Sequence, residues 1–410
     1  MRGAQRTMGY SYEEVMDFIE QEDVRFIRLA FTDAYGRQKN IAIPPDELPR
    51  AFSDGISFDA SAIAGFTNVV KSDLFLFPIP STLTVLPWRS FHGKVVRMFC
   101  EIRYPDGTPF NKDSRAILGS AIRAAADIGL SVFIGTEFEF YLFNTDEKGQ
   151  PTREPLDNAG YFDVAPYDKG ENVRRDIVLT IKDMGMHPET SHHEEGPGQN
   201  EVDFRHSDAM TAADNALNFV TVVHAIAAQN GLVADFSPKP LSDHEGNGLH
   251  INISVNRLDG GDSEEINRYF MAGVLAHIKE LSVYLNPSED SYKRLGELKA
   301  PKYISWSHQN RSQLIRIPAA NGAYKRFELR SADPSANPYI AFALLIRAGL
   351  DGINNKLELP APVDADLTDR ETAAKAGLDK LPDYLSEAIE LAKNSEFINS
   401  VLPENFLKLL

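Results

Sequence analysis

The chain has 410 residues, and its 42 Lys and Arg against 59 Asp and Glu give a formal net charge of −17. Hydrophobic residues at 43% and charged residues at 25% are typical of folded proteins and exclude general disorder. The acidic balance argues against nucleic acid or an anionic membrane as a partner, since either would need a basic surface. The single cysteine excludes an intramolecular disulfide and a cysteine-built zinc site.

The first hundred residues predict a small α+β unit. A short helix is expected over residues 12–21, and strands over residues 24–31, 40–43, 74–79 and 94–102. Cys100 lies in an apolar run of the last strand, so we interpret it as a core residue and not as a nucleophile. The turn-rich segment 104–109 is the predicted boundary, and the length also favours two domains, 1–105 and 106–410.

Beyond this boundary the pattern mixes helices and strands, which predicts an α+β fold for the second domain as well. Helices are expected over residues 114–127, 212–229, 266–285, 337–350 and 384–393. Strands are expected over residues 131–143, 249–255, 313–317 and 327–330. No apolar run is long enough for a membrane span and no apolar signal core is present at the N-terminus, so we expect a cytoplasmic protein without a membrane partner.

Two groups of glutamates indicate a bound cation. Glu137 and Glu139 alternate with phenylalanines on one predicted strand and therefore share a face, where their charges repel unless a cation lies between them. A Gly-Pro-Gly turn at residues 196–198 would bring Glu194 and Glu201 towards one point, as the oxygen ligands of a hard cation require. A solvated strand face and an acidic surface loop are the alternatives.

Histidine and arginine stand on two other predicted strands. His250, Asn252 and Ser254 share one face of a strand that follows two glycines, which favours a functional site over a structural histidine. Glu328 stands between two arginines, Arg326 and Arg330, on one strand face. Such arginines suit phosphate or carboxylate with the glutamate on a metal, although a cross-strand ion-pair ladder would look the same.

The sequence has no phosphate-binding P-loop, no dinucleotide-binding glycine motif and no Ser or Cys nucleophile motif. Carboxylate-bound metals with several arginines instead suit phosphoryl transfer, in which both neutralise phosphate oxygens.

These motifs resemble those of the glutamine synthetase family, in its bacterial type I form, over nearly the whole chain. The matching segments are residues 58–66, 135–140, 158–163, 192–205, 246–254, 294–295, 310–318 and 326–339. The resemblance implies an N-terminal β-grasp domain and a C-terminal catalytic domain with a curved antiparallel sheet and helices. It also implies a homo-oligomer with active sites between subunits. Because the chain ends at Leu410, before the family's usual ring-docking helix, a hexameric ring and a dodecamer both stay open.

The resemblance implies a ligase that takes glutamate, ATP and an amine. The glutamate γ-carboxylate would attack the ATP γ-phosphate, and the amine would then displace phosphate from the acyl phosphate to form the γ-amide. Two divalent cations, Mg²⁺ or Mn²⁺, would bind in each active site. By this resemblance one cation is held by Glu139, Glu194 and Glu201, and the other by Glu137, His250 and Glu328.

The remaining site residues are also assigned by resemblance. Glutamate would be bound by Gly246, Arg294 and Arg330, with Tyr161 beside the acceptor site. The ATP site would be lined by Glu189, Asn252, Ser254, Arg311 and Arg316, and Arg311 would also stabilise the transferring group. Asp59, supplied by a neighbouring subunit, would bind and deprotonate ammonium.

Departures from the family pattern concern the acceptor amine. Lys299 replaces the catalytic glutamate of a loop that is one residue shorter here, and Ala62 replaces a hydroxyl residue beside the ammonium site. Glu245 replaces an asparagine beside the glutamate amino group. Segment 363–370 lacks the tyrosine that some relatives adenylylate, so we expect no such control. Ammonium is the default acceptor. A larger amine, such as an alkylamine or a polyamine, and a non-catalytic family member are the alternatives.

Overall fold

The computed structural model describes residues 9–89, 93–320, 322, 325–404 and 406. These residues form two compact units. The first runs to Ala116 and includes Lys182–Met186, and the second holds Ile117–Ile181 and the residues from His187 onward. The domain limits of 1–105 and 106–410 stay a prediction.

The first unit is built on a six-stranded sheet. Its order is β2 (Gln38–Ile43), β1 (Val24–Thr32), β6 (Lys94–Arg103), β4 (Asp73–Pro78) and β3 (Ile56–Asp59), with β5 (Thr84–Val85) also paired to β6. Its helices are α1 (Tyr12–Gln21) and α2 (Leu48–Ser53), and its 3₁₀ turns are Pro45–Glu47, Ala60–Ala62, Pro80–Thr82 and Pro87–Arg89. Cys100 is buried in β6, as predicted.

Helix α1 shows how the sequence determines one element of this unit. Ser11 caps its N-terminus, and the backbone N–H of Ser11 donates to Glu14 in return. Val15 and Ile19 lie four residues apart on one face, and both are buried. The helix therefore begins and ends as the sequence predicts.

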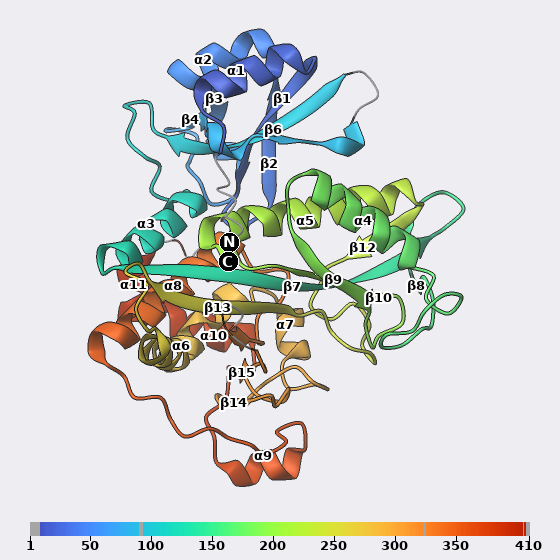
Figure 1. Cartoon of the computed structure of the whole chain (residues 1–410), viewed down its shortest axis with the longest axis vertical. Helices are drawn as coiled ribbons and strands as arrows, with labels where there is room; N and C mark the ends of the chain where they lie inside the picture. The colour runs from blue at the N-terminus through green and yellow to red at the C-terminus, as the bar shows by residue number, and fades with distance from the viewer. Residues whose placement is uncertain (1–8, 90–92, 321, 323–324, 405, 407–410) are drawn as a thin grey trace. The chain divides into compact units, whose positions relative to one another are not determined.

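The second unit is built on a ten-stranded sheet (Figure 1). Its order is β14 (Trp306–His308), β15 (Ile315–Ile317), β16 (Phe327–Leu329), β13 (Leu249–Arg257), β7 (Leu130–Thr145), β10 (Gln199–Phe204) and β9 (Pro188–His193). Three further strands pair with β7, namely β8 (Pro151–Pro155), β11 (Ser207–Asp208) and β12 (Leu232–Asp235). All pairs are antiparallel except β14 with β15.

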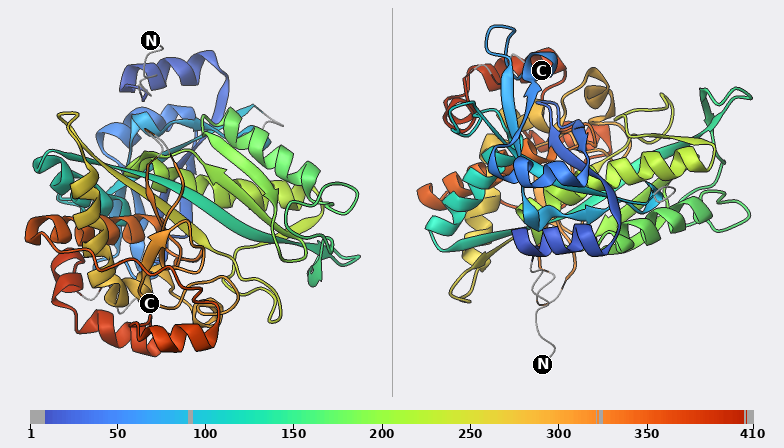
Figure 2. Two further views of the ribbon diagram at one scale, coloured as in Figure 1. Left: turned by 60° about the horizontal axis from the view of Figure 1, so that its bottom comes forward. Right: turned by 90° about the horizontal axis from the view of Figure 1, so that it is seen from above.

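Helices pack against this sheet: α5 contacts β7 and β12, α6 contacts β13, and α8 contacts both α5 and α6 (Figure 1). The helices are α3 (Ser114–Asp127), α4 (Glu171–Asp183), α5 (Ala209–Gln229), α6 (Glu264–Leu285), α7 (Glu289–Arg294), α8 (Pro338–Asn355), α9 (Arg370–Ala376), α10 (Leu385–Lys393) and α11 (Glu396–Val401). Figure 2 shows the same helices from two further directions. The α+β class is confirmed, and no helix among the described residues is long and apolar enough to cross a membrane.

The strand register decides which side chains meet on β7. In β13, His250 lies opposite Glu137. In β10, Glu201 lies opposite Glu139 and Asp203 lies opposite Glu137. Since directly opposed residues on neighbouring strands face the same side of the sheet, five polar side chains gather over the middle of β7.

Candidate active site

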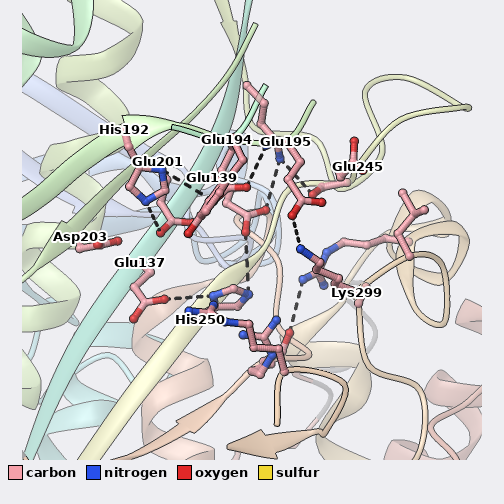
Figure 3. Close-up of a pocket in the computed structure, with 18 of the residues that line it drawn as sticks. Glu137, Glu139, His192, Glu194, Glu195, Glu201, Asp203, Glu245, His250 and Lys299 are labelled. Atoms are coloured by element: carbon pink, nitrogen blue, oxygen red, sulfur yellow. Dashed lines mark hydrogen bonds and ion pairs between the residues drawn. The ribbon is translucent and has the colours of Figure 1, made fainter. Parts of the chain in front are cut away.

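A cavity of about 430 Å³ lies in the second unit over these strands (Figure 3). Carboxylates and arginines share its wall. The carboxylates are Glu137, Glu139, Glu194, Glu195, Glu201, Asp203, Glu245 and Glu297. The arginines are Arg294, Arg311, Arg316, Arg326 and Arg330. Most of the residues predicted for metals and glutamate are thus brought to one place.

The first group with metal-ligand geometry consists of Glu137, His250 and Glu328, whose ligand atoms lie within 4.8 Å of one another. His250 Nδ1 is 3.1 Å from Glu137 Oε2 and 3.5 Å from Glu328 Oε1. Strands β7, β13 and β16 each contribute one of these residues. This group is the same trio that the resemblance implies for one cation.

The second predicted trio is spread over two overlapping groups. Glu201 lies within 4.8 Å of Glu139 and His250 in one group, and of His192 and Glu194 in the other. His192 Nε2 is 3.3 Å from Glu201 Oε1. Glu139 is oriented by the backbone N–H of Gly248, which donates to Glu139 Oε2 at 2.7 Å. His192 is thus an additional ligand candidate, outside the two trios that the resemblance implies.

Burial and mutual repulsion raise the pKa values of three crowded carboxylates, Glu194, Glu201 and Asp203. Burial and the neighbouring Glu139 raise the pKa of Glu194 to about 8. Burial, Asp203 and Glu139 raise the pKa of Glu201, and burial and Glu137 raise the pKa of Asp203 to about 6. A divalent cation among these oxygens would reverse these shifts, because it favours the ionised form. The oxygen and imidazole donors fit Mg²⁺ or Mn²⁺.

Glu137 behaves differently from the other carboxylates. Burial alone would raise its pKa, but the hydrogen bond and positive charge of His250, helped by Asn252, lower the pKa of Glu137 to about 2. Asn252 Nδ2 donates to Glu137 Oε1 at 2.8 Å, and Asn252 Oδ1 accepts from Arg326 Nε at 2.8 Å. Asn252 therefore orients a metal-ligand candidate in this structure.

Two arginines converge on Glu328 at the floor of the site. Arg330 Nη1 donates to Glu328 Oε1 at 2.7 Å, and Arg316 Nη1 donates to Glu328 Oε2. The Nε atoms of both arginines are buried without a hydrogen-bond partner in the described part of the chain. Because a buried guanidinium N–H is costly to leave unpaired, these arginines are suited to an anionic ligand.

Gly246 and Arg294 lie together at another part of the wall. Arg294 is buried, and its Nη1 donates to the carbonyl oxygen of Ser331 at 2.9 Å. A Cβ on Gly246 would lie 2.4 Å from the carbonyl oxygen of Pro238 and 2.9 Å from Arg294 Cγ. Only glycine fits this position without displacing the arginine. Glu245, which precedes it, also lines the cavity.

Only some of the residues assigned to ATP by resemblance line the cavity. Arg311 and Arg316 line the cavity. Glu189 is exposed on β9, and Ser254 lies opposite Phe133 in the β13–β7 pair, both outside the residues that line the cavity. Their role in ATP binding stays a prediction.

Lys299 lies in the cavity wall and forms an ion pair with Glu195 (Figure 3). Its loop is tight, because the N–H of Gly296 donates to the carbonyl oxygen of Ala300 at 3.1 Å. Glu297 of the same loop lines the cavity as well, and its Oε1 is 3.5 Å from Arg370 Nη2. The loop thus presents one cation and one carboxylate to the cavity.

Tyr161 also lines the cavity, as the resemblance implies for the acceptor site. Its ring stacks on Phe162 with the centroids 4.0 Å apart, and both rings meet His192 edge to face. Phe162 has φ of +62°, a left-handed conformation that is strained for an aromatic residue. This backbone strain is retained directly beside the cavity.

Asp59 belongs to the first unit, where it ends β3 and is exposed. Its Oδ1 accepts from the N–H of Ser61 at 2.9 Å and from Ser61 Oγ at 2.6 Å. These two hydrogen bonds hold the pKa of Asp59 below its usual value. Ala62 follows in the same 3₁₀ turn and carries no hydroxyl.

Sequence reasoning missed several residues of the cavity. They are Phe162, Thr190, His192, Gln199 and Asp203. A signal existed for two of them, because Gln199, Glu201 and Asp203 alternate and therefore share one face of a strand. The sequence interpretation treated this stretch as a turn, so the alternation was not used.

Comparison with known proteins identifies the family. The family model described as the β-grasp domain of glutamine synthetase matches residues 23–105, and the one described as its catalytic domain matches residues 111–409. A glutamine synthetase of Clostridium saccharobutylicum is 43% identical over 409 residues, covering 97% of this chain and 92% of the relative. One of Methanosarcina mazei is 44% identical over 406 residues, covering 96% and 91%.

Solved structures agree with this. A structure of a GmaS/ADP complex superposes with a TM-score of 0.87 at 28% identity, covering 96% of this chain and 94% of that one. A ligand-free GmaS structure gives the same TM-score and identity and covers 96% and 93%. Fold and cavity thus define a ligase that combines a β-grasp domain with a catalytic domain. The chain belongs to the glutamine synthetase family, in which ATP and metal binding are typical.

Proposed function

We propose that this chain is an ATP-dependent glutamate–amine ligase, in which the glutamate γ-carboxylate is activated as an acyl phosphate and then amidated. The observation that carries this proposal is the cavity in which Glu137, His250 and Glu328 meet beside two arginines with unpaired buried N–H groups. Transfer of a phosphoryl group from a triphosphate to a carboxylate needs both metal ions and arginines, because both neutralise the oxygens of the reacting anions.

The metal sites would be formed by two sets of side chains. One cation would be held by Glu137, His250 and Glu328, and the other by Glu139, Glu194 and Glu201, with His192 close to the second set. Bound Mg²⁺ or Mn²⁺ would shield the carboxylate from the triphosphate and polarise the transferring phosphoryl group.

The protein's own side chains would position both substrates. Arg294, buried beside Gly246, would pair with the α-carboxylate of glutamate. Arg330 and Arg316, which converge on Glu328, would face the transferring group. Arg311, exposed at the cavity wall, would contact phosphate oxygens of ATP.

The acceptor amine would enter near Tyr161, and ammonium is the default. Asp59 of a neighbouring subunit would deprotonate it, in a homo-oligomer with shared active sites. Asp59 is exposed and its carboxylate is held in the ionised form by Ser61, which supports binding of the ammonium cation.

A larger amine is the second candidate, and two observations favour it. Lys299 places a positive charge in the cavity wall and engages Glu195, so a small cation such as ammonium would be repelled and would find one carboxylate already paired. The solved structures with TM-scores of 0.87 are of GmaS, a γ-glutamylmethylamide synthetase. Ala62 would leave space for a carbon-bearing substituent.

The test is phosphate release from ATP with glutamate and Mg²⁺ or Mn²⁺, across ammonium and a panel of primary amines, with the amide product identified by mass. Fast turnover with ammonium would establish a glutamine-forming enzyme, and turnover only with a larger amine would establish the second candidate. Silence throughout, in protein shown to bind ATP, would contradict both. Glu137→Gln is the control, because it removes a metal-ligand candidate and should abolish any genuine turnover.

A further inference from the structure

A buried ion network lies behind the cavity wall and has not entered the proposed function. Asp157, Asp168, Arg174, His193 and Asn200, here called the hub, are all buried. His193 bonds to Asp157 Oδ1 through Nε2 at 2.9 Å, Arg174 pairs with both oxygens of Asp168, and Arg174 Nη1 also donates to Asn200 Oδ1 at 2.6 Å. The charges of the hub therefore satisfy one another.

The hub contains three residues with metal-ligand spacing, Asp157, Asp168 and His193. A cation there is not favoured, because Asp168 is already paired with the guanidinium of Arg174 and Asp157 is already paired with His193. The second ring nitrogen of His193, Nδ1, bonds to the carbonyl oxygen of Glu194. We therefore interpret the hub as a structural network and not as a further metal site.

On one side the hub holds the turn that carries the metal-ligand candidate Glu194. This turn, residues 194–198, joins β9 to β10. His193 Nδ1 bonds to the carbonyl oxygen of Glu194 at 2.7 Å. The N–H of Gly198 donates to Asp157 Oδ1 at 3.0 Å, and Asn200 Nδ2 donates to the carbonyl oxygen of Gly198 at 2.9 Å. Both ends of the turn are therefore fixed from behind.

On the other side the hub holds the aromatic loop, residues 158–169, which brings Tyr161 and Phe162 to the cavity. The N–H groups of Ala159 and Lys169, at its two ends, donate to Asp157 at 3.3 Å and 2.9 Å. In its middle, the N–H of Phe162 donates to the carbonyl oxygen of His193 at 3.1 Å. The same two hub residues thus bond to both the turn and the loop.

We propose that His193 is a positioning residue that couples cation binding at the 194–198 turn to the placement of the aromatic loop. Its ring is the connection between the Glu194 backbone and Asp157, and Asp157 holds the ends of the loop. Residues that orient metal ligands from behind affect metal affinity, and a rigid network that is shared by two segments transmits order from one to the other. The inference rests on the metal assignment of the proposed function.

The test uses Mn²⁺ alone and two variants that each remove half of the connection. The amide of Gln reaches about as far as Nε2 of a histidine, and that of Asn about as far as Nδ1. His193→Gln should keep the bond to Asp157, and His193→Asn should keep the bond to Glu194. Calorimetry gives the Mn²⁺ affinity, and hydrogen exchange gives the protection of residues 158–169 with and without Mn²⁺.

In the wild type, Mn²⁺ should slow exchange in both the turn and the aromatic loop. Both variants should bind Mn²⁺ about tenfold more weakly. At saturating Mn²⁺, the extra protection of the loop should fall by about fivefold or more, while the turn stays protected. Undiminished loop protection in both variants would overturn the inference.

Loss of folding is separated from loss of coupling by a matched control. His277 on α6 also bonds to two carboxylates, Glu280 and Asp351, but lies outside the residues that line the cavity. His277→Gln should leave Mn²⁺ affinity and loop protection at wild-type values, and a loss there would overturn the inference as well. If a His193 variant unfolds, Asp157→Asn/His193→Gln removes both charges of the pair and takes its place.

The two proposals fail separately. Absence of Mn²⁺ binding to the wild type would overturn the metal assignment and this inference together. Mn²⁺ binding without protection of the loop would overturn the inference alone. Silence in the amine panel would contradict the proposed ligase but not the coupling, because the exchange measurement needs no turnover.

Discussion

Lys299 and Glu195 form the contact through which the proposed acceptor preference can be tested at the scale of single residues. The pair joins the loop after Arg294 to the turn after Glu194, and both side chains line the cavity. Much of Lys299 is exposed, so the pair itself adds little stability. Its consequence is electrostatic, because it decides the sign of the charge that an incoming amine meets.

We expect Lys299→Glu to raise ammonium-dependent turnover by about tenfold, because about 1.4 kcal/mol of electrostatic repulsion near the acceptor is enough for that factor. The measurement is kcat/KM for ammonium at fixed glutamate and ATP. Turnover that stays unchanged or falls would contradict the account of Lys299 as the group that excludes ammonium.

The charge swap Glu195→Lys/Lys299→Glu is the matched control for this prediction. It restores an ion pair between the same positions with the polarity reversed and returns a positive charge to the cavity wall. Ammonium turnover should therefore fall back towards the wild-type value. A double variant as active as Lys299→Glu would show that relaxation of the loop, and not charge, had caused the gain.

The raised pKa values of the carboxylates predict how metal binding depends on pH. The folded pKa of Glu194, about 8, lies above the value of about 4.3 for an unfolded glutamate. The metal-free folded state thus holds extra protons, and the stability they contribute is complete below pH about 4 and is lost as the pH rises to 8. Asp203, with a pKa of about 6, acts in the same direction.

A divalent cation must displace these protons, so its affinity should rise with pH. We expect Mg²⁺ to raise the melting temperature more at pH 8 than at pH 6. If one proton is displaced, the affinity for Mg²⁺ should increase by up to about 100-fold over that interval. In Glu194→Gln much of this dependence should disappear. An affinity that is flat or falls with pH in the wild type would contradict the metal assignment.

At the scale of elements, helices α6 and α8 pack with their backbones in contact through glycine. A Cβ on Gly273 of α6 would lie 2.1 Å from the carbonyl oxygen of Ala348, and one on Gly352 of α8 would lie 2.2 Å from the carbonyl oxygen of Tyr269. These are backbone atoms of the neighbouring helix, which cannot turn away. The helices therefore approach as closely as they do only because both positions lack a side chain.

Gly273→Ala should lower the free energy of unfolding by about 1–3 kcal/mol, because the added methyl group forces the two helices apart. Gly119→Ala is the matched control. It places the same methyl group in α3, where the nearest atoms are 3.4 Å and 3.6 Å away, so the better helix propensity of alanine should raise stability by up to about 1 kcal/mol. Chemical denaturation measures both. Equal effects of the two variants would contradict the packing argument.

The elements also show what the sequence predicts and where it stops. Alternation predicted β7 and β13, and the faces of Glu137 and His250, to within a few residues. The pairing that sets these two residues opposite each other depends on strand register, which a single sequence does not contain. The trio with Glu328 therefore came from resemblance, and the structure then placed it within 4.8 Å.

Other elements were missed for identifiable reasons. Helix α4 buries Val173, Ile177 and Ile181, which recur every four residues, so its signal was present and was overlooked. The hub carried no such signal, because His193 and Asp157 are 36 positions apart and meet only in the folded chain. The fold also separates two adjacent histidines: His192 lines the cavity, and His193 is buried in the hub.

At the scale of the whole molecule, the net charge of −17 acts on charged substrates before they reach the cavity. A negative protein attracts a cationic acceptor and repels glutamate and ATP over distances of about the Debye length, roughly 10 Å at 0.1 M salt. Added salt screens both effects. The KM for a cationic amine and the KM for glutamate should therefore move in opposite directions as ionic strength rises.

We expect the KM for the amine to rise, and that for glutamate to fall, by about two- to threefold between low and physiological ionic strength, where screening changes most. Initial rates at constant pH and constant free Mg²⁺ measure both KM values. A comparison of potassium chloride with a second salt of the same valence at each ionic strength excludes an effect of one particular ion. If both constants moved in the same direction, the field of the whole molecule would not be what the substrates meet, and local charges such as Lys299 and Arg294 would alone determine their affinity.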